Sequence, residues 1–307
     1  MTADRVLEDA ARVALRAPSI HNTQPWQWRV RPGILELHVD PRWQLKLADP
    51  DGRLMVLSCG AGLHHARVAI EVAGYRPTVQ RIPDPDRPDL LALITPDEVA
   101  PPDDRTTRLL EAALRRRTDR RAVRNVPIPQ SALDRIRQAA TAEGVWLHLL
   151  NTDQVRKALV AAEHAESAEY ADSGYRQELR AWTSVQTQAT AGIPGAVLAP
   201  RGRSYPAVGR YAVLFGDSDQ PVSWLRAGEA LSAMWLTATE EGLAVQPMSS
   251  LIEAPAGRAV LHQILSGIGS HLVVHFGAPS DAESGARTGR RLPEESIEVV
   301  DEGLPQP

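Results

Sequence analysis

The chain has 307 residues, with 34 Lys and Arg against 38 Asp and Glu, so its formal net charge is −4. That balance argues against a general nucleic-acid binder, which needs a basic surface to displace counterions. With 43% hydrophobic and 23% charged residues, the composition is typical of a soluble globular protein. The length fits one large domain or two smaller ones.

Cysteine and hydropathy patterns indicate where such a protein resides. Cys59 is the only cysteine, which excludes an intrachain disulfide and a cysteine-based metal cluster within one chain. Asp4, Glu8 and Asp9 interrupt the N-terminal apolar residues, which is wrong for a signal peptide, and no run approaches 18 apolar residues. We therefore expect a cytoplasmic protein without a membrane partner.

In the first third of the chain, hydrophobic patterns typical of helices and of strands follow one another. Helical spacing from Val6 to Ala17 predicts a helix that Pro18 ends. Strands are expected at 26–30, 34–39, 78–82 and 90–94, and a long buried helix at 54–74. Clustered prolines and acidic residues at 96–104 mark the strongest composition break, so we predict one half at 1–100 and another at 101–307.

The second half repeats this alternation. Helices are predicted up to Arg117 and at 131–143, 153–182 and 222–242, and strands at 146–150, 211–216 and 270–277. The segment 184–209 has no sustained periodicity, which is typical of a lid, a binding loop or disorder.

The two long helices resemble each other. Superposing Gly74 on Gly242 places Gly60 on Gly228 and Leu63 on Leu231. Two buried helices with the same glycine cap can agree by chance, but the elements around them also follow in the same order. An internal repeat is therefore the favoured interpretation.

The most specific motif is APSIHNTQPW at 17–26. A proline-stopped helix leads into a polar turn whose backbone amides, Ser19 hydroxyl and Asn22 amide can hydrogen-bond a polar ligand. The alternative is a structural Asx-type turn capped by Pro25 and anchored by Trp26. The motif resembles the flavin-binding segment of the nitroreductase family, FMN-dependent oxidoreductases that are normally homodimers with a flavin at each subunit interface. The resemblance assigns FMN contacts to Pro18, Ser19, Ile20 and Asn22.

A second segment, RRTDRR from Arg116, resembles the family's phosphate-binding segment and places Arg116, Thr118 and Arg120 at the FMN phosphate. Guanidinium and hydroxyl donors suit a dianionic phosphate. A solvated basic helix end is the alternative.

These two segments occupy different halves. The first half lacks the phosphate segment, and the second half lacks the APSxxNxQPW pattern after its first helix. In the family's homodimer they reach one flavin from different subunits. The resemblance therefore implies a fused pseudo-dimer with one flavin site, similar to the Acg-type flavoproteins of actinobacteria, that is monomeric. The implied fold is α+β, with antiparallel-rich sheets packed on the two long helices and halves that do not fold independently.

Two further segments are assigned by resemblance. GLAVQPMSS places Pro247, Met248 and Ser249 beside the flavin ring, although Ser249 and Ser250 depart from the family pattern, so we assign no catalytic residue. GRRLPEE makes Arg290 and Arg291 candidates for a second pair of phosphate ligands, with a disordered basic tail as the alternative.

The resemblance implies an NAD(P)H-dependent reductase of nitroaromatic or quinone-like compounds. The alternative is an FMN-binding or sequestering protein whose flavin is occluded. Apolar residues between glycines predict a lid near 190–205. FMN is favoured over FAD or a nicotinamide dinucleotide as the resident cofactor, because no glycine-rich pyrophosphate fingerprint is present. His64 and His65 are adjacent on a helix and cannot share a face, and His271 and His275 could share a strand face but have no identified third ligand, so no metal site is expected.

Overall fold

The computed structural model describes residues 2–120, 123–183, 190–192, 208–280 and 288–300. In the first third of the chain the elements are α1 (Ala3–Ala14), η1 (Ile20–Asn22), β1 (Trp26–Arg31), β2 (Ile34–Val39), η2 (Pro41–Trp43), α2 (Arg53–Val72), β3 (Tyr75–Arg81) and β4 (Leu90–Val99). They are followed by α3 (Asp104–Arg115), α4 (Gln130–Ala142), β5 (Trp146–Leu149), α5 (Thr152–Ala171), α6 (Ser173–Thr183), β6 (Arg210–Gly216), α7 (Pro221–Glu240), β7 (Ala244–Met248), α8 (Ser250–Glu253), α9 (Pro255–Ile264), β8 (Gly269–Gly277), α10 (Pro293–Ser296) and β9 (Ile297–Val299).

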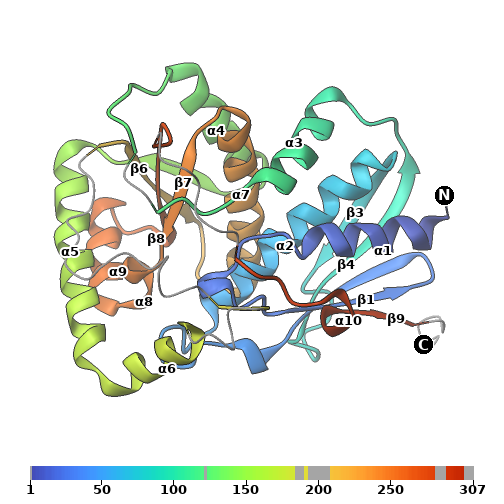
Figure 1. The fold of residues 1–307 in the computed structure, drawn as a ribbon, viewed down its shortest axis with the longest axis horizontal. Coiled ribbons are helices and arrows are strands. Elements are labelled where there is room, and N and C mark those ends of the chain that lie inside the picture. Colours follow the sequence, from blue (N-terminus) through green and yellow to red (C-terminus); the bar gives the residue numbers. More distant parts are fainter. Residues whose placement is uncertain (1, 121–122, 184–189, 193–207, 281–287, 301–307) are drawn as a thin grey trace.

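Two sheets lie on opposite sides of the long helices α2 and α7 (Figure 1). The first sheet has the order β3-β4-β2-β1-β9, and the second has the order β5-β6-β8-β7. Read from the other edge, the second sheet repeats the first four strands in the same succession, with β7, β8, β6 and β5 in place of β3, β4, β2 and β1. Every pairing between named strands is antiparallel except that of β1 with β9. The predicted α+β fold with antiparallel-rich sheets on long central helices is confirmed.

The long helices cross where each has a glycine. A Cβ added to Gly60 would lie 1.9 Å from the carbonyl oxygen of Leu225, and a Cβ added to Gly228 would lie 1.9 Å from that of Leu57. Superposing Gly60 on Gly228 also places Leu57 on Leu225, so the two contacts are equivalent by pseudo-twofold symmetry. The helix repeat inferred from the sequence is therefore also a repeat in space.

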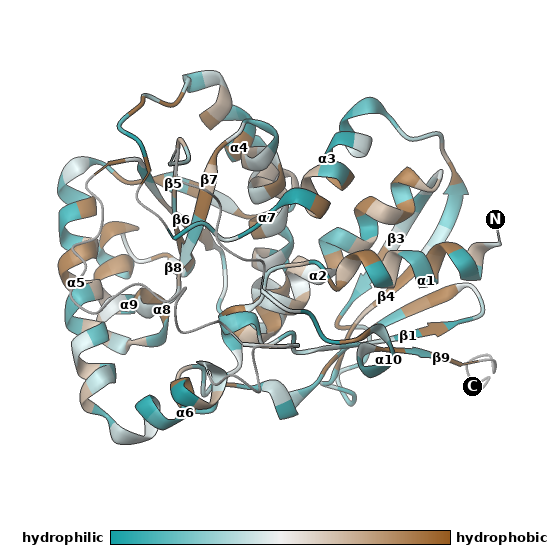
Figure 2. Cartoon of the chain, in the orientation of Figure 1, coloured by the Kyte–Doolittle hydropathy of each residue, from teal (hydrophilic) through white to brown (hydrophobic). Residues whose placement is uncertain are grey.

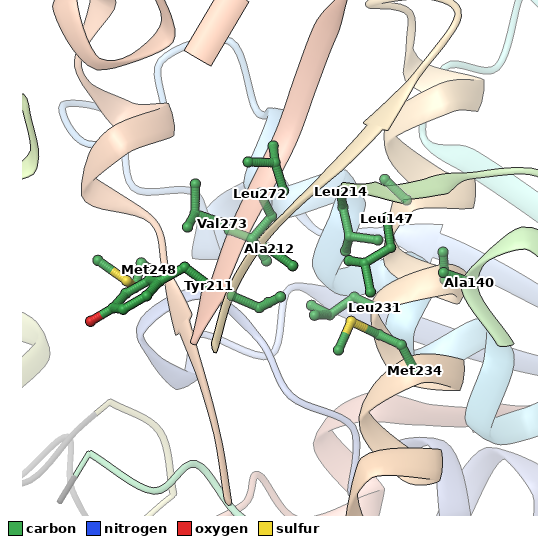
Figure 3. Close-up of a cluster of buried hydrophobic side chains, with 14 of the residues drawn as sticks. Ala140, Leu147, Tyr211, Ala212, Leu214, Leu231, Met234, Met248, Leu272 and Val273 are labelled. Atoms are coloured by element: carbon green, nitrogen blue, oxygen red, sulfur yellow. The ribbon is translucent and has the colours of Figure 1, made fainter. Parts of the chain in front are cut away.

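Each sheet has its own apolar core against these helices. Trp26 and Trp28 of β1 are completely buried with residues of α1 and α2. The other core contains Leu147, Leu214 and residues of α4 and α7, among them Leu231 and Met234 (Figure 3). Apolar positions concentrate on the elements between the layers, whereas the outward side of helices such as α5 is more polar (Figure 2). No helix in the described part of the chain is long and apolar enough to cross a membrane.

The C-terminal segment leaves the second half and joins the first sheet. Ile297 of β9 pairs with Trp28 of β1. In Figure 1, β9 lies beside β1 and directly after α10. Helix α3 contributes Leu109 to a small cluster with Val68 of α2 and Leu236 of α7. Both arrangements connect the halves beyond the helix crossing, and the boundary near residue 100 stays a prediction.

Some elements differ from the sequence expectation. The helices expected at 153–182 are α5 and α6, and the sequence did not place the break between them. It falls at Asp172, whose backbone is extended and whose side chain accepts a hydrogen bond from the Tyr175 amide at 2.9 Å. The strand β7 was not predicted, because Pro247 lies within it and proline is disfavoured inside sheets. The strand β9 was too short to be recognised from alternation.

Alanine at Gly60 should destabilise the protein strongly, because its methyl group would overlap backbone that cannot rotate away. We expect a loss of about 3 kcal/mol or more in the free energy of unfolding, at the upper end of overpacking effects. Urea denaturation of Gly60→Ala measures it. Gly62→Ala in the same helix is the control, since its Cβ would be 3.4 Å from the Trp28 side chain at the closest, an ordinary contact. Equal stability of the two variants would contradict a tight helix crossing.

Candidate functional site: a buried arginine pair beside a strained turn

The turn at residues 17–26, called the motif turn below, has a strained backbone. His21, Asn22 and Gln24 all have positive φ angles, of 42°, 57° and 54°. Such angles are costly for residues other than glycine and cluster at functional sites. The Ser19 Oγ accepts a hydrogen bond from the Gln24 amide at 3.0 Å, and the Ile20 amide donates to the hydroxyl of Ser58 in α2 at 2.9 Å. These bonds fix the turn on the N-terminal part of α2.

Side chains of the motif turn bind two segments of the second half. The Asn22 amide donates to the carbonyl oxygens of Gly192 and Gly289, each at 3.0 Å. The side-chain amide of Gln24 donates from Nε2 to the carbonyl of Thr190 at 2.8 Å. The beginning of the predicted lid therefore lies against the motif turn, while 193–207, which include most of that prediction, lie outside the described residues.

Two arginines from distant segments converge on the end of α1. Arg116 and Arg290 each direct Nη2 toward the carbonyl oxygen of Arg16, at 3.4 Å. Arg290 also donates to Asn22 Oδ1 at 2.9 Å. The sequence-predicted residues Arg116, Arg290 and Asn22 are thus brought together at one place.

In the described structure, the positive charges of Arg116 and Arg290 are not balanced by a carboxylate. Arg116 is only 9% exposed, and its Nε and Nη1, like the Nε of Arg290, have no hydrogen-bond partner among the described residues. Neither guanidinium forms an ion pair with any carboxylate in the parts of the chain that are described. Burial, with repulsion from Arg290, lowers the pKa of Arg116 to about 9, and burial, with repulsion from Arg16, lowers the pKa of Arg290 to about 10. Buried cations with unused donors form a site suited to an anion.

An aromatic ring supports the pair from α7. The guanidinium carbon of Arg116 lies 4.5 Å from the ring centroid of Trp235, which is buried. A cation over an aromatic face gains part of the stabilisation that a buried carboxylate would otherwise provide. Trp235 holds Arg116 without neutralising its charge.

The segment that carries Thr118 and Arg120, the other residues predicted to bind the phosphate, lies beside β7. Thr118 forms an isolated parallel bridge with Val245, and the Asp119 amide donates to the carbonyl of Val245 at 3.1 Å. Burial lowers the pKa of Arg120. The sequence-separated segments carrying Thr118 and Pro247 are therefore adjacent, while Met248 is buried and Ser249 directly precedes α8.

Arg291 is placed differently from Arg290. Its guanidinium lies 4.3 Å from the Trp43 ring centroid and donates to the carbonyls of Gln24, at 3.0 Å, and Glu295, at 2.6 Å. Its backbone amide donates to Gln24 Oε1 at 2.9 Å. As placed, Arg291 binds the backbone of the motif turn, whereas Arg290 faces Arg116.

Sequence reasoning missed Arg16 and Trp235 as parts of this site. Arg16 directly precedes the motif turn, and this position in the sequence could have indicated that Arg16 belongs to the site. Trp235 had only helical spacing, which does not distinguish a core tryptophan from one under an arginine. Among the described residues, no group of three or more His, Cys, Asp or Glu is placed to hold a metal ion.

The symmetry-related position has no corresponding turn. Residues 15–25 connect α1 to β1, whereas only residues 143–145 connect α4 to β5. Near this short connection, Arg67 Nη1 lies 2.6 Å from Glu143 and 3.0 Å from Glu229, and Arg81 Nη2 lies 2.6 Å from Glu229. Here the arginines are paired with carboxylates inside the protein, so the two pseudo-equivalent places differ in both shape and charge.

The chain is similar to curated proteins of Mycobacterium tuberculosis over nearly its whole length. No protein-family model matches the chain. The protein named "Putative NAD(P)H nitroreductase Rv3131" of Mycobacterium tuberculosis is 36% identical over 96% of this chain and 91% of its own length. "Putative NAD(P)H nitroreductase acg" of the same organism is 32% identical over 97% of both chains.

Among solved structures, a nitroreductase with bound FMN from Bacteroides fragilis is 19% identical, with a TM-score of 0.42 over 59% of this chain and 94% of that one. The mycobacterial relatives match nearly the full length at a much higher identity, and they confirm the resemblance stated from the motifs. The chain belongs to the nitroreductase family, together with the Acg-type members of M. tuberculosis.

Proposed function

We propose that the protein binds one FMN per chain and uses it for NAD(P)H-dependent reduction of nitroaromatic or quinone-like compounds. The observation that carries this proposal is the buried Arg116 and Arg290 pair, which lacks a carboxylate partner in the described structure and lies beside the strained motif turn. Names of the mycobacterial relatives support the same activity class.

The residues present fit an FMN phosphate. Arg116 and Arg290 would bind it through their unused N–H groups, with Thr118 and Arg120 donating from the segment beside β7. Pro18, Ser19, Ile20 and Asn22 would line the ribityl chain and the ring edge, and Pro247, Met248 and Ser249 would lie beside the ring. Arg291 would act by holding the motif turn. When bound, FMN supplies a carrier that accepts and donates hydride.

A single site per chain follows from the asymmetry of the halves. The second copy of the turn is missing, and Glu143 and Glu229 neutralise the arginines near the corresponding position. Because both segments that the family takes from two subunits are in one chain, the functional unit would be a monomer.

A second candidate function is FMN sequestration behind a closed loop. Three hydrogen bonds support it: those from Asn22 and Gln24 to Gly192 and Thr190, and the return bond from the Gly192 amide to the Asn22 carbonyl at 3.2 Å. Under this alternative, residues 190–192, which are bound to the motif turn, would belong to a lid that covers the flavin and excludes a nicotinamide.

Replacing Arg116 by leucine should separate ligand binding from stability. We expect at least a tenfold loss of FMN affinity and, in flavin-free protein, a gain of about 1 kcal/mol, because a buried cation without a counter-charge is removed. Flavin fluorescence titration and urea denaturation measure the two effects. The exposed neighbour substitution Arg117→Leu is the control and should change neither. A destabilised variant with unchanged FMN affinity would show that Arg116 is a structural residue.

The two proposals differ in whether a nicotinamide can reduce the bound FMN. Under anaerobic conditions, NADPH or NADH should bleach the visible absorbance of FMN in a reductase, with one flavin reduced per chain. Dithionite provides the control for a reducible flavin. Bleaching by dithionite with none by either nicotinamide would favour sequestration, and two FMN per chain would contradict the single-site geometry.

A further inference from the structure

We propose a proton relay that is formed by Glu169, Tyr175, Glu253 and His21. It leads from the protein surface at α5 and α6 to the motif turn, where His21 protonates a quinone-like acceptor. This inference rests on the proposed function and adds to it the path by which the required proton arrives. The four residues come from α5, α6, α8 and η1, so only the folded chain brings them together.

His21 is at the site end of the relay. It precedes Asn22 in the motif turn, and its positive φ of 42° sets the direction of its side chain. Its Nε2 is buried and has no hydrogen-bond partner among the described residues, while Glu253 Oε1 lies 3.9 Å away, within ion-pair range. An imidazole so placed can receive a proton from the carboxyl group and donate it toward the ligand side of the turn.

Glu253 connects the two cofactor segments. It ends α8, directly after the Pro247–Ser249 segment, and its side chain is 3% exposed. Although burial alone would raise the pKa of Glu253, its interactions with His21, Ser249 and Tyr175 hold that pKa below its ordinary value. An ionised carboxylate is the form that can accept a proton from the surface side.

Tyr175 and Glu169 complete the path outward. The Tyr175 hydroxyl donates to Glu253 Oε2 at 3.0 Å, and Glu169 interacts with the same hydroxyl from α5. Burial, with repulsion from Glu253, raises the pKa of Glu169 to about 8, so its carboxyl group is protonated at neutral pH and can donate to the tyrosine oxygen. Each group then donates inward to the next.

The charged groups next to this relay include a cation, because Arg258 Nη1 donates to the backbone carbonyls of Ile252, at 2.6 Å, and Glu253, at 3.0 Å. The other charged groups acting on it are Asp49, before α2, and Glu166, one turn before Glu169. Burial, with repulsion from Glu253, raises the pKa of Asp49 to about 6. Asp49 and Glu166 are acidic and favour retention of a proton within the relay, whereas Arg258 is held on backbone carbonyls at the end of α8.

The chemistry balances with one proton for each acceptor. Two-electron reduction of a quinone-like compound requires a hydride and one proton at oxygen. The reduced flavin supplies the hydride and is thereby oxidised. The Nδ1–H bond of His21 breaks as the O–H bond of the product forms, while the buried Nε2, 3.9 Å from Glu253 Oε1, takes up a proton from that carboxyl group. Glu253 is resupplied with a proton through Tyr175 and Glu169 from water.

The test uses the full chain with FMN, reduced by dithionite and mixed with benzoquinone, so that it does not depend on reduction by a nicotinamide. Tyr175→Phe should slow flavin reoxidation about tenfold, a modest effect for loss of a proton path. Tyr170→Phe, a hydroxyl on α5 outside the relay, should not. The rate in the unmodified protein should fall as pH rises through about 8, where Glu169 loses its proton. Glu169→Gln should abolish that dependence, and the exposed Glu163→Gln should keep it.

A readout without flavin chemistry is the pH dependence of the His21 ring resonances in the NMR spectrum. In the flavin-free chain these resonances should show an inflection near pH 8 that is absent in Glu169→Gln and retained in Glu163→Gln. An inflection unchanged by Glu169→Gln, with equal reoxidation rates for the two tyrosine variants, would overturn the relay even if NADPH reduces the FMN. Failure of NADPH and NADH to reduce FMN would instead contradict the proposed reductase, and the inflection would still decide the relay.

Discussion

The close crossing of α2 and α7 at Gly60 and Gly228 is the constraint on which the rest of the structure depends. Carbonyl oxygens of Leu57 and Leu225 occupy the space that side chains at these glycines would need, so the helices approach at backbone distance. Each helix carries its own sheet, and the crossing therefore fixes the separation of the two sheets. It also places Trp235 of α7 under Arg116 and lets Ser58 of α2 hold the motif turn.

Electrostatics distinguish the two places that this pseudo-symmetry creates. At one, Arg116 and Arg290 remain buried without a carboxylate partner in the described structure, which costs stability and leaves donors for an anion. At the other, Arg67 and Arg81 are neutralised by Glu143 and Glu229. Under the proposed function, the bound anion would compensate for this loss of stability, which is the usual relation between stability and a binding site.

Much of the fold was predictable from the sequence, because hydrophobic periodicity and glycine spacing are local signals. Gly60 and Gly228 could be paired from the helix repeat alone, and the motif turn with RRTDRR indicated two halves of one site. The separate roles of Arg290 and Arg291 could not be predicted, since adjacent residues in an irregular tail face directions set by Asn22, Trp43 and Gln24. The relay could not be predicted either, because its members come from four elements with no common spacing.

The short connection between α4 and β5 has an evolutionary consequence. In a homodimer each substitution occurs twice, so a change that closes one interface site also closes the other. In this fused chain, superposing Gly60 on Gly228 pairs Ala61 with Glu229 and Arg67 with Trp235, residues of quite different chemistry at equivalent places. Fusion therefore releases each half from the sequence of the other. One of the two places now holds the ion pairs of Arg67 with Glu143 and Glu229, while the other, under the proposed function, keeps the residues that bind FMN.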